Sequence, residues 1–186
     1  MPKYIMEMVL EYAKVFPENA DMGNPEGNKL QKDIHNKGGQ YVLNAYFTKE
    51  SQIEDLLVDG MIPKPLGHER FIQGNAEFGI GKFIKLKRDV QDKIMTFTNN
   101  KKGTTVDVNY GGAPKIVDLR NGRENKRWWS YEEDGSLGNG TTAMVEFSTY
   151  KDGAGVRLES VGVLDLVPYE SQDSIYEEHN ALFEVD

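Results

Sequence analysis

Two short segments combine aromatic and basic side chains in patterns that suit contact with a nucleic acid. The first is Lys82-Phe83-Ile84-Lys85-Leu86-Lys87-Arg88. In a β-strand successive side chains alternate faces, so Ile84 and Leu86 would both point to one face. The opposite face would then carry Phe83, Lys85 and Lys87. A ring between lysines can stack on a base while the cations meet the flanking phosphates. An ordinary amphipathic strand with solvated lysines is the alternative interpretation.

The second segment, residues 120–131, has four cations before two adjacent tryptophans and a tyrosine, and it has no helix or strand periodicity. Neighbouring residues of a strand point to opposite faces, so at least one tryptophan is expected in the core. The other could lie exposed beside Arg127 and stack on a base or a guanidinium. A loop with one buried tryptophan is the alternative.

A flexible basic turn, Asn99-Asn100-Lys101-Lys102-Gly103, lies between the two segments. Such a turn can equally be an ordinary hairpin turn with no part in binding. The predicted nucleic-acid-binding residues are Phe83, Lys85, Lys87, Lys101, Lys102, Arg120, Arg123, Lys126, Arg127, Trp128 and Trp129.

Charge is distributed unevenly along the 186 residues, whose net charge is −8. Residues 170–186 carry six acids and no Lys or Arg, which leaves −2 for residues 1–169 (22 basic and 24 acidic side chains). Within that body, residues 82–131 hold twelve basic and five acidic side chains, a local charge of +7. A basic middle can bind a polyanion despite the overall sign, because phosphates respond to the local field.

Signatures of enzymes are scarce, so we expect no catalytic residue, no metal and no cofactor. The chain has no cysteine, and its histidines (His35, His68 and His179) lack metal-ligand spacing. The run Gly79-Ile80-Gly81-Lys82 lacks the spacing and the Ser/Thr of a phosphate-binding P-loop. Three carboxylates could in principle hold Mg²⁺ and keep a metal-dependent nuclease open as an alternative: Asp107, Asp118 and Asp165.

Apolar patterning predicts a mainly β chain with one intervening helix. Residues 4–15 fit a strand or a short helix, and residues 16–39, rich in Pro, Asn, Gly and charge, are predicted to form a long loop. Residues 41–47 are predicted as a strand and residues 48–60 as the helix. Further strands are expected at residues 82–88, 93–98, 104–110, 115–119, 141–150 and 156–167. Five or more short strands favour a small OB-like barrel, with a sandwich as the alternative.

The expected organisation is one domain over residues 1–169 followed by an acidic C-terminal tail at 170–186. The tail is predicted to be disordered, since it has little apolar surface to bury. We find no signal peptide and no apolar stretch near the ~18–20 residues that a membrane span requires.

The order of these parts resembles the single-stranded-DNA-binding proteins of tailed bacteriophages. The resemblance rests on Leu137-Gly138-Asn139-Gly140-Thr141 before two final strands, on Gly23-Asn24-Pro25 before a strand and helix, and on an acidic tail that contains Phe183. It covers about two-thirds of the chain by order of parts, and no single motif in it is diagnostic. In this chain Phe183 is followed by Glu184-Val185-Asp186, whereas the aromatic residue stands last in the family.

The resemblance implies an OB-fold that binds single-stranded DNA with little sequence preference during phage replication and recombination, in the cytoplasm of the infected host. It implies no cofactor, dimers in some members, and recruitment of replication proteins such as polymerase or helicase-primase through the tail. The tail residues predicted to bind partners are Asp173, Glu177, Glu178, Phe183, Glu184 and Asp186. A phage structural or adaptor protein that uses a β-barrel for protein contacts is the alternative from another class.

Overall fold

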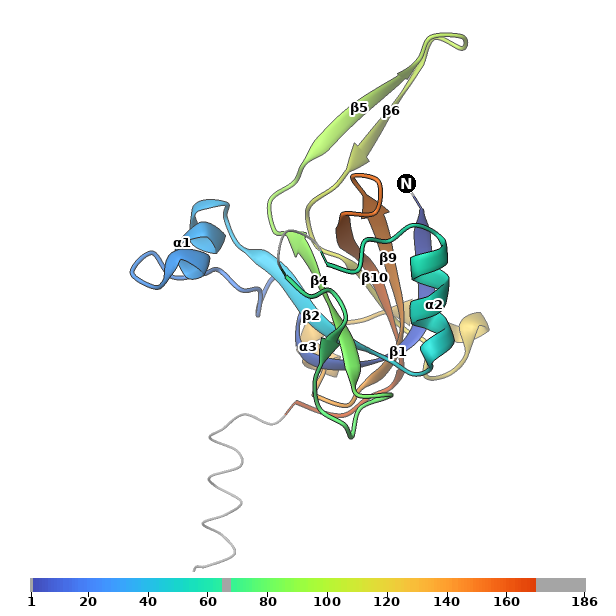
Figure 1. Ribbon diagram of the computed structural model, residues 1–186. Helices are drawn as coiled ribbons and strands as arrows, with labels where there is room; N and C mark the ends of the chain where they lie inside the picture. Colours follow the sequence, from blue (N-terminus) through green and yellow to red (C-terminus); the bar gives the residue numbers. More distant parts are fainter. Residues whose placement is uncertain (1, 65–67, 170–186) are drawn as a thin grey trace, which may run out of the picture.

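The fold is organised around one large, curled β-sheet, seen in a computed structural model that describes residues 2–64 and 68–169 (Figure 1). Eight strands lie in the order β3-β4-β2-β1-β9-β10-β7-β8, and a hairpin of β5 and β6 forms a separate sheet. The elements are β1 (Lys3–Lys14), α1 (Lys29–Asn36), β2 (Gln40–Phe47), α2 (Glu50–Val58), β3 (Ile72–Gln73), β4 (Lys82–Asp89), β5 (Ile94–Asn99), β6 (Thr104–Asn109), β7 (Lys115–Asp118), a 3-10 turn (Arg123–Asn125), β8 (Arg127–Trp128), α3 (Tyr131–Asp134), β9 (Thr142–Tyr150) and β10 (Gly155–Asp165).

The curl of the sheet brings β4 close to β10, although these strands are four places apart in the main sheet. Their link is a side chain: Arg88 of β4 donates hydrogen bonds to the Leu158 carbonyl and the Glu159 carboxylate of β10. Neighbours in the sheet are antiparallel except β7 and β10, which run parallel. The predicted mainly β class is confirmed. Among the described residues no backbone ladder joins β4 to β10, so the sheet is curled but unclosed.

The core lies on the inner face of this curl and follows the two-residue period of the strands. Met8 and Leu10 of β1 are fully buried, while the side chains between and beside them reach the outer face. The same alternation is clear along β4 and most of β9, whereas nearly every side chain of β2 is buried and the pattern of β10 is irregular. The inner residues include Leu43, Phe47, Ile84, Leu86, Val145, Phe147, Leu158 and Val163.

The sequence left a strand or a short helix open for the first segment. In the structure residues 3–14 form a strand, β1. The helix expected at residues 48–60 is confirmed as α2, which places Ile53 and Leu56 in the core. Its start is fixed by the Gln52 side chain, whose oxygen accepts the backbone N–H of Thr48.

The prediction of one helix and a long loop at residues 16–39 is wrong, because α1 occupies part of that loop and α3 adds a third helix. Helix α1 buries only Ile34, and its one apolar pair at helical spacing, Leu30 and Ile34, is too short a pattern to predict a helix within a segment rich in Pro, Asn and Gly. Its start is set locally by the Asn28 side chain, which accepts the N–H of Gln31 at 2.9 Å.

The β5–β6 hairpin projects from the body as an arm next to the turn between β9 and β10 (Figure 1). Both strands were expected from the sequence, but they stand outside the main sheet. Nearly every side chain of the arm is exposed. Among the described helices, none is long and apolar enough to cross a membrane.

Candidate nucleic-acid interface

Strand β4 presents its lysines outward, as its alternation predicts. Ile84 and Leu86 are buried, whereas Lys85 and Lys87 are exposed. Phe83 is half-buried and packs against Tyr46 of β2, with ring centroids 5.1 Å apart. One side of the ring is therefore already occupied by the protein.

Lys85 and Lys87 line a cleft of about 530 Å³ that sequence order could not reveal. Its walls come from β4, from the root of the arm, from the β9–β10 hairpin, and from Lys37 and Arg70 in two loops. Of the fourteen lining residues within the described ranges 2–64 and 68–169, eight are basic, two are tyrosines and only Asp89 is acidic. The basic set is Lys37, Arg70, Lys85, Lys87, Arg88, Lys93, Lys151 and Arg157, and the tyrosines are Tyr110 and Tyr150.

The cleft keeps a surplus of positive charge after its internal ion pairs are counted. Lys37 and Lys93 both pair with Asp89, while Arg88 and Arg157 share Glu159. Within the described part of the chain, the remaining lysines (Lys85, Lys87 and Lys151) have no carboxylate within ion-pair distance. Partial loss of hydration, with the like charges of Lys85 and Lys37, lowers the pKa of the Lys87 ammonium. Such crowding of cations favours a polyanionic ligand that would relieve it.

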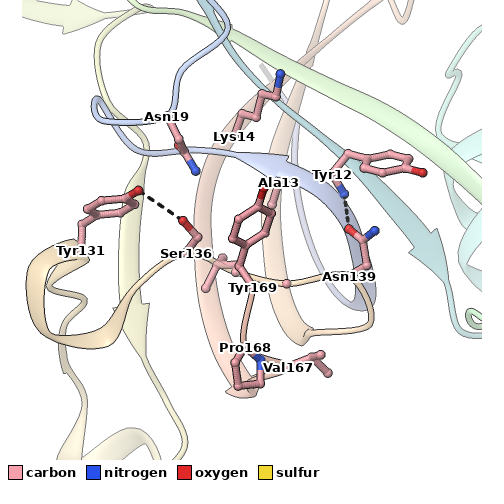
Figure 2. Close-up of a pocket in the computed structure, with 12 residues that line it drawn as sticks. Tyr12, Ala13, Lys14, Asn19, Tyr131, Ser136, Asn139, Val167, Pro168 and Tyr169 are labelled. Atoms are coloured by element: carbon pink, nitrogen blue, oxygen red, sulfur yellow. Dashed lines mark hydrogen bonds between the residues drawn. The ribbon is translucent and has the colours of Figure 1, made fainter. Parts of the chain in front are cut away.

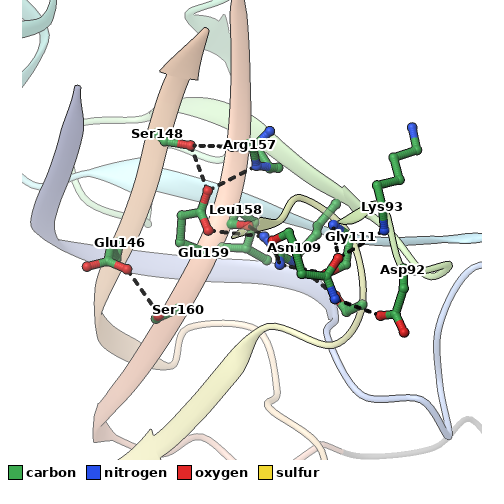
Figure 3. Close-up of polar contacts among 12 residues, drawn as sticks. Asp92, Lys93, Asn109, Gly111, Glu146, Ser148, Arg157, Leu158, Glu159 and Ser160 are labelled. Atoms are coloured by element: carbon green, nitrogen blue, oxygen red, sulfur yellow. Dashed lines mark hydrogen bonds and ion pairs between the residues drawn. The ribbon is translucent and has the colours of Figure 1, made fainter. Parts of the chain in front are cut away.

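A polar network holds the far wall of the cleft in place (Figure 3). The Arg157 guanidinium donates to Glu159 Oε1 at 3.0 Å, and Ser148 Oγ donates to the same oxygen at 2.7 Å. The guanidinium carbon of Arg157 lies 4.4 Å from the ring centroid of Tyr110 and 5.5 Å from that of Tyr150. Both tyrosine rings are half-buried and lie against the Arg157 guanidinium, so this wall brings cations and aromatic rings together, the two kinds of group that contact phosphates and bases in single-strand sites.

The tryptophan segment divides as its alternation predicts, with one ring in the core and one outside. Trp129 is 8% exposed and its indole N–H donates to the Gly135 carbonyl at 2.9 Å. The Arg120 guanidinium lies 4.9 Å from the Trp129 ring centroid. Trp128 is 67% exposed. The inclusion of Trp129 among the base-contacting residues is therefore corrected, because its ring is enclosed by the protein's own side chains.

Two of the cations before the tryptophans are engaged by acids. Arg127 pairs with Asp118 at 3.0 Å and with Asp134 at 2.7 Å, and Arg120 pairs with Asp118 at 2.9 Å. Hydrogen bonds from Arg120 lower the pKa of the Asp118 carboxyl, and those from Arg127 lower the pKa of Asp134 to about 2. Both acids stay charged at neutral pH, so this cluster has less positive field to offer than its sequence predicts.

Trp128 lines a separate, mostly apolar groove of about 430 Å³ on the outer side of the sheet. Its neighbours there include Ile5, Val117 and Leu119, with Lys126 and Arg127 at the same groove. The two aromatic and basic segments of the sequence therefore do not share one cleft. A role for Trp128, Lys126 and Arg127 in DNA binding stays a prediction for a second surface.

The other predicted residues lie apart from both surfaces or outside the described residues. Lys101 and Lys102 are in the turn at the tip of the arm, and Arg123 is exposed in the 3-10 turn. The residues predicted for partner binding lie outside the described residues: Asp173, Glu177, Glu178, Phe183, Glu184 and Asp186.

A larger cavity than this cleft, about 820 Å³, lies elsewhere and is rich in tyrosine (Figure 2). Tyr12, Tyr131 and Tyr169 line it, and the Tyr12 N–H donates to Asn139 Oδ1 at 2.7 Å. Among the described residues that line it, Lys14 is the only basic one. Since charge rather than volume decides where a polyanion binds, the basic cleft is the better candidate.

No group of three or more His, Asp or Glu side chains in residues 2–64 and 68–169 is placed to hold a metal ion. The carboxylates considered for Mg²⁺ are spread over β6 (Asp107), β7 (Asp118) and β10 (Asp165). Comparisons with protein-family models and with curated proteins found no match.

Proposed function

We propose that the protein binds single-stranded DNA with little sequence preference, through the cleft between β4, the arm and the β9–β10 hairpin. The observation that carries this proposal is the convergence of eight cations and two tyrosine rings around a cleft with one acidic lining residue. Lysine and arginine neutralise phosphates and release counterions, while rings stack on unpaired bases. Sequence preference is weak because every base offers a π-face.

We also propose that the curled sheet is an open OB-like barrel. Five of its strands, β4-β2-β1-β9-β10, are consecutive neighbours, and Arg88 brings the two ends of that series together. A small, partly open five-stranded barrel is the architecture of OB-folds, which bind oligonucleotides across a strand face flanked by loops. The cleft lies beside such a face, between β4 and two hairpins.

The resemblance to tailed-phage proteins supplies the biological context of the proposal. In that context the protein coats and protects displaced strands during phage replication and recombination in the infected cell, as a monomer or homodimer. Its acidic tail recruits replication proteins such as a polymerase or helicase-primase. The chemistry is physical binding, with no catalytic step.

Titration of labelled oligo(dT) and of a matched duplex tests the proposal. We expect tight binding of the single strand, with log Kobs falling linearly against log salt at about −0.7 per phosphate neutralised. Four to six engaged cations give a slope of roughly −3 to −4 by the same rule. A structural or adaptor protein would bind neither DNA, and a metal-dependent nuclease would degrade the strand when Mg²⁺ is added. An affinity that does not change with salt concentration would contradict the electrostatic account.

Removal of residues 170–186 is expected to raise affinity for single strands, most clearly at low salt. The six tail acids are tethered to the domain and compete with DNA for cations at a high effective concentration, which salt screens. Paired titrations of the full-length and shortened proteins at two salt concentrations measure the effect. Recruitment of replication partners should be lost with the tail and partly lost in Phe183→Ala. Equal or weaker DNA binding by the shortened protein at both salts would exclude competition by the tail.

A further inference from the structure

The β5–β6 arm has two chemically different faces. Residues paired across an antiparallel hairpin have side chains on the same face. The pairs Met95–Val108 and Phe97–Val106 therefore form one apolar face, while Thr96–Asp107 and Ile94–Asn109 lie on the other. On the second face Thr96 Oγ1 donates to Asp107 Oδ1 at 2.6 Å, which places the acid of β6 away from the apolar side.

The apolar face of the arm is open to solvent. Met95, Phe97 and Val106 are 53%, 47% and 60% exposed. A shallow hollow of about 450 Å³ lies along its outer half, where Phe97 and Val106 meet Lys101 of the tip. An isolated two-stranded hairpin is marginally stable in water, so a face of this kind favours a ligand that covers it.

This face continues directly from the wall of the basic cleft. The backbone N–H of Tyr110 donates to the Lys93 carbonyl at 2.9 Å, which extends the pairing of the arm by one step towards the body. Both Tyr110 and Lys93 line the cleft. The Tyr110 ring meets the Phe97 ring edge-on, with centroids 6.3 Å apart, so the aromatic surface runs unbroken from the cleft onto the arm.

The charges along the arm fit the same ligand as the cleft. Lysines stand at both ends of the apolar face: Lys93 at the root, and Lys101 and Lys102 at the tip. By the alternation of the strands, no acidic side chain of β5 or β6 lies on this face. A single strand of nucleic acid matches it, with bases against Phe97 and its neighbours and phosphates near the lysines.

We propose that the arm is a second segment of the DNA-binding surface, along which a strand continues after it leaves the cleft. This inference rests on the proposed function of the cleft and adds the arm as a length-dependent extension. Six paired residues at about 3.3 Å each give a track of roughly 20 Å. The cleft alone then suffices for a short oligonucleotide, whereas a longer one uses both segments.

The test is the double variant Phe97→Thr/Val106→Thr in the full chain, titrated with oligo(dT) of about 6 and about 20 nucleotides, which span the range of OB-type sites. Threonine suits a β-strand, so the hairpin is retained. We expect roughly tenfold weaker binding of the longer strand, as loss of one base–ring stack implies, and unchanged binding of the shorter one. Ile94→Thr, which removes an equally exposed apolar side chain from the opposite face, is the control and should bind both strands normally.

Other outcomes would overturn the role of the arm or the proposed function. Unchanged binding of the longer strand by the double variant, or equal weakening for both lengths, would overturn the role of the arm while leaving the cleft intact. Unchanged DNA binding with loss of self-association in sedimentation would instead assign the apolar face to a second copy of the chain, and would also overturn the inference. Failure of the unaltered protein to bind either strand would refute the proposed function itself.

Discussion

Replacement of Lys85, Lys87 and Lys151 by alanine is expected to weaken binding of single-stranded DNA by roughly 100-fold at low salt. These lysines line the cleft, and among the described residues none of them has an ion-pair partner, so their charge is available to phosphates. One close contact between unit charges contributes about 1 kcal/mol in water, and three contribute about 3 kcal/mol. The magnitude of the salt slope should fall by about 2, at ~0.7 for each lost phosphate contact.

A triple variant of exposed lysines outside the cleft and the arm provides the matched control. Lys3→Ala/Lys29→Ala/Lys49→Ala changes the net charge by the same amount, and these positions lie in β1, in α1 and before α2. It should bind within about twofold of the unaltered protein if position rather than total charge decides. Equal losses in the two triple variants would show that binding is not localised to the cleft.

Trp128→Ala should be titrated alongside these variants, because it distinguishes binding at the outer groove of the sheet from binding at the cleft and arm. If the cleft and arm carry binding, this variant retains the affinity of the unaltered protein. A loss of about 1–3 kcal/mol, the range for one base–ring stack, would move a strand contact to the outer groove of the sheet. Normal binding by the cleft variant together with such a loss would transfer the proposed site there.

Substitution of Arg88 by alanine is expected to lower the free energy of unfolding by about 3–5 kcal/mol, the range for removing one partner of a buried ion pair. The Arg88 side chain is 8% exposed and pairs with Glu159 at 3.0 Å. It also donates hydrogen bonds to four backbone carbonyls, those of Asn109, Gly111, Gly112 and Leu158. Loss of these contacts leaves the buried carbonyl oxygens and the Glu159 carboxylate without the Arg88 donor. It also removes the side-chain link from β4 to β10 and to the root of the arm.

Urea unfolding measures this loss, and a further variant keeps the test decisive if Arg88→Ala does not fold. Arg88→Lys retains the charge, but its single ammonium cannot reach five acceptors, so an intermediate loss is expected. Adding Glu159→Gln to Arg88→Ala should lower the stability further, because in Arg88→Ala the Glu159 carboxylate still pairs with Arg157 at 3.0 Å. A loss below about 1 kcal/mol in both single variants would show that the β4–β10 contact is held by apolar packing alone.

Local patterns in the sequence predicted the longer strands after β1, whereas β3 and β8, with two residues each, were not predicted and β1 was left open between strand and helix. Residues 82–88 could be divided into an inner and an outer face because the two-residue period of a strand is a local property. The same logic predicted that at least one of the two tryptophans is buried, but only the structure shows that this is Trp129 and that Trp128 is exposed. Helix α1 escaped this reasoning, since it buries one side chain and depends on an asparagine cap rather than on periodicity.

The candidate site was decided by tertiary structure, because its residues come from segments that no sequence pattern connects. Lys37, Arg70, Tyr110 and Arg157 reach the cleft only when the sheet curls and β10 approaches β4. The fold also neutralises part of the positive charge that the sequence predicts for residues 120–131, because Asp134 of α3 and Asp118 of β7 pair with Arg127. The sequence by itself determined the chemistry available and the direction of each strand face. Only the fold decided which cations remain unpaired and converge, since that depends on distances between residues far apart in the chain.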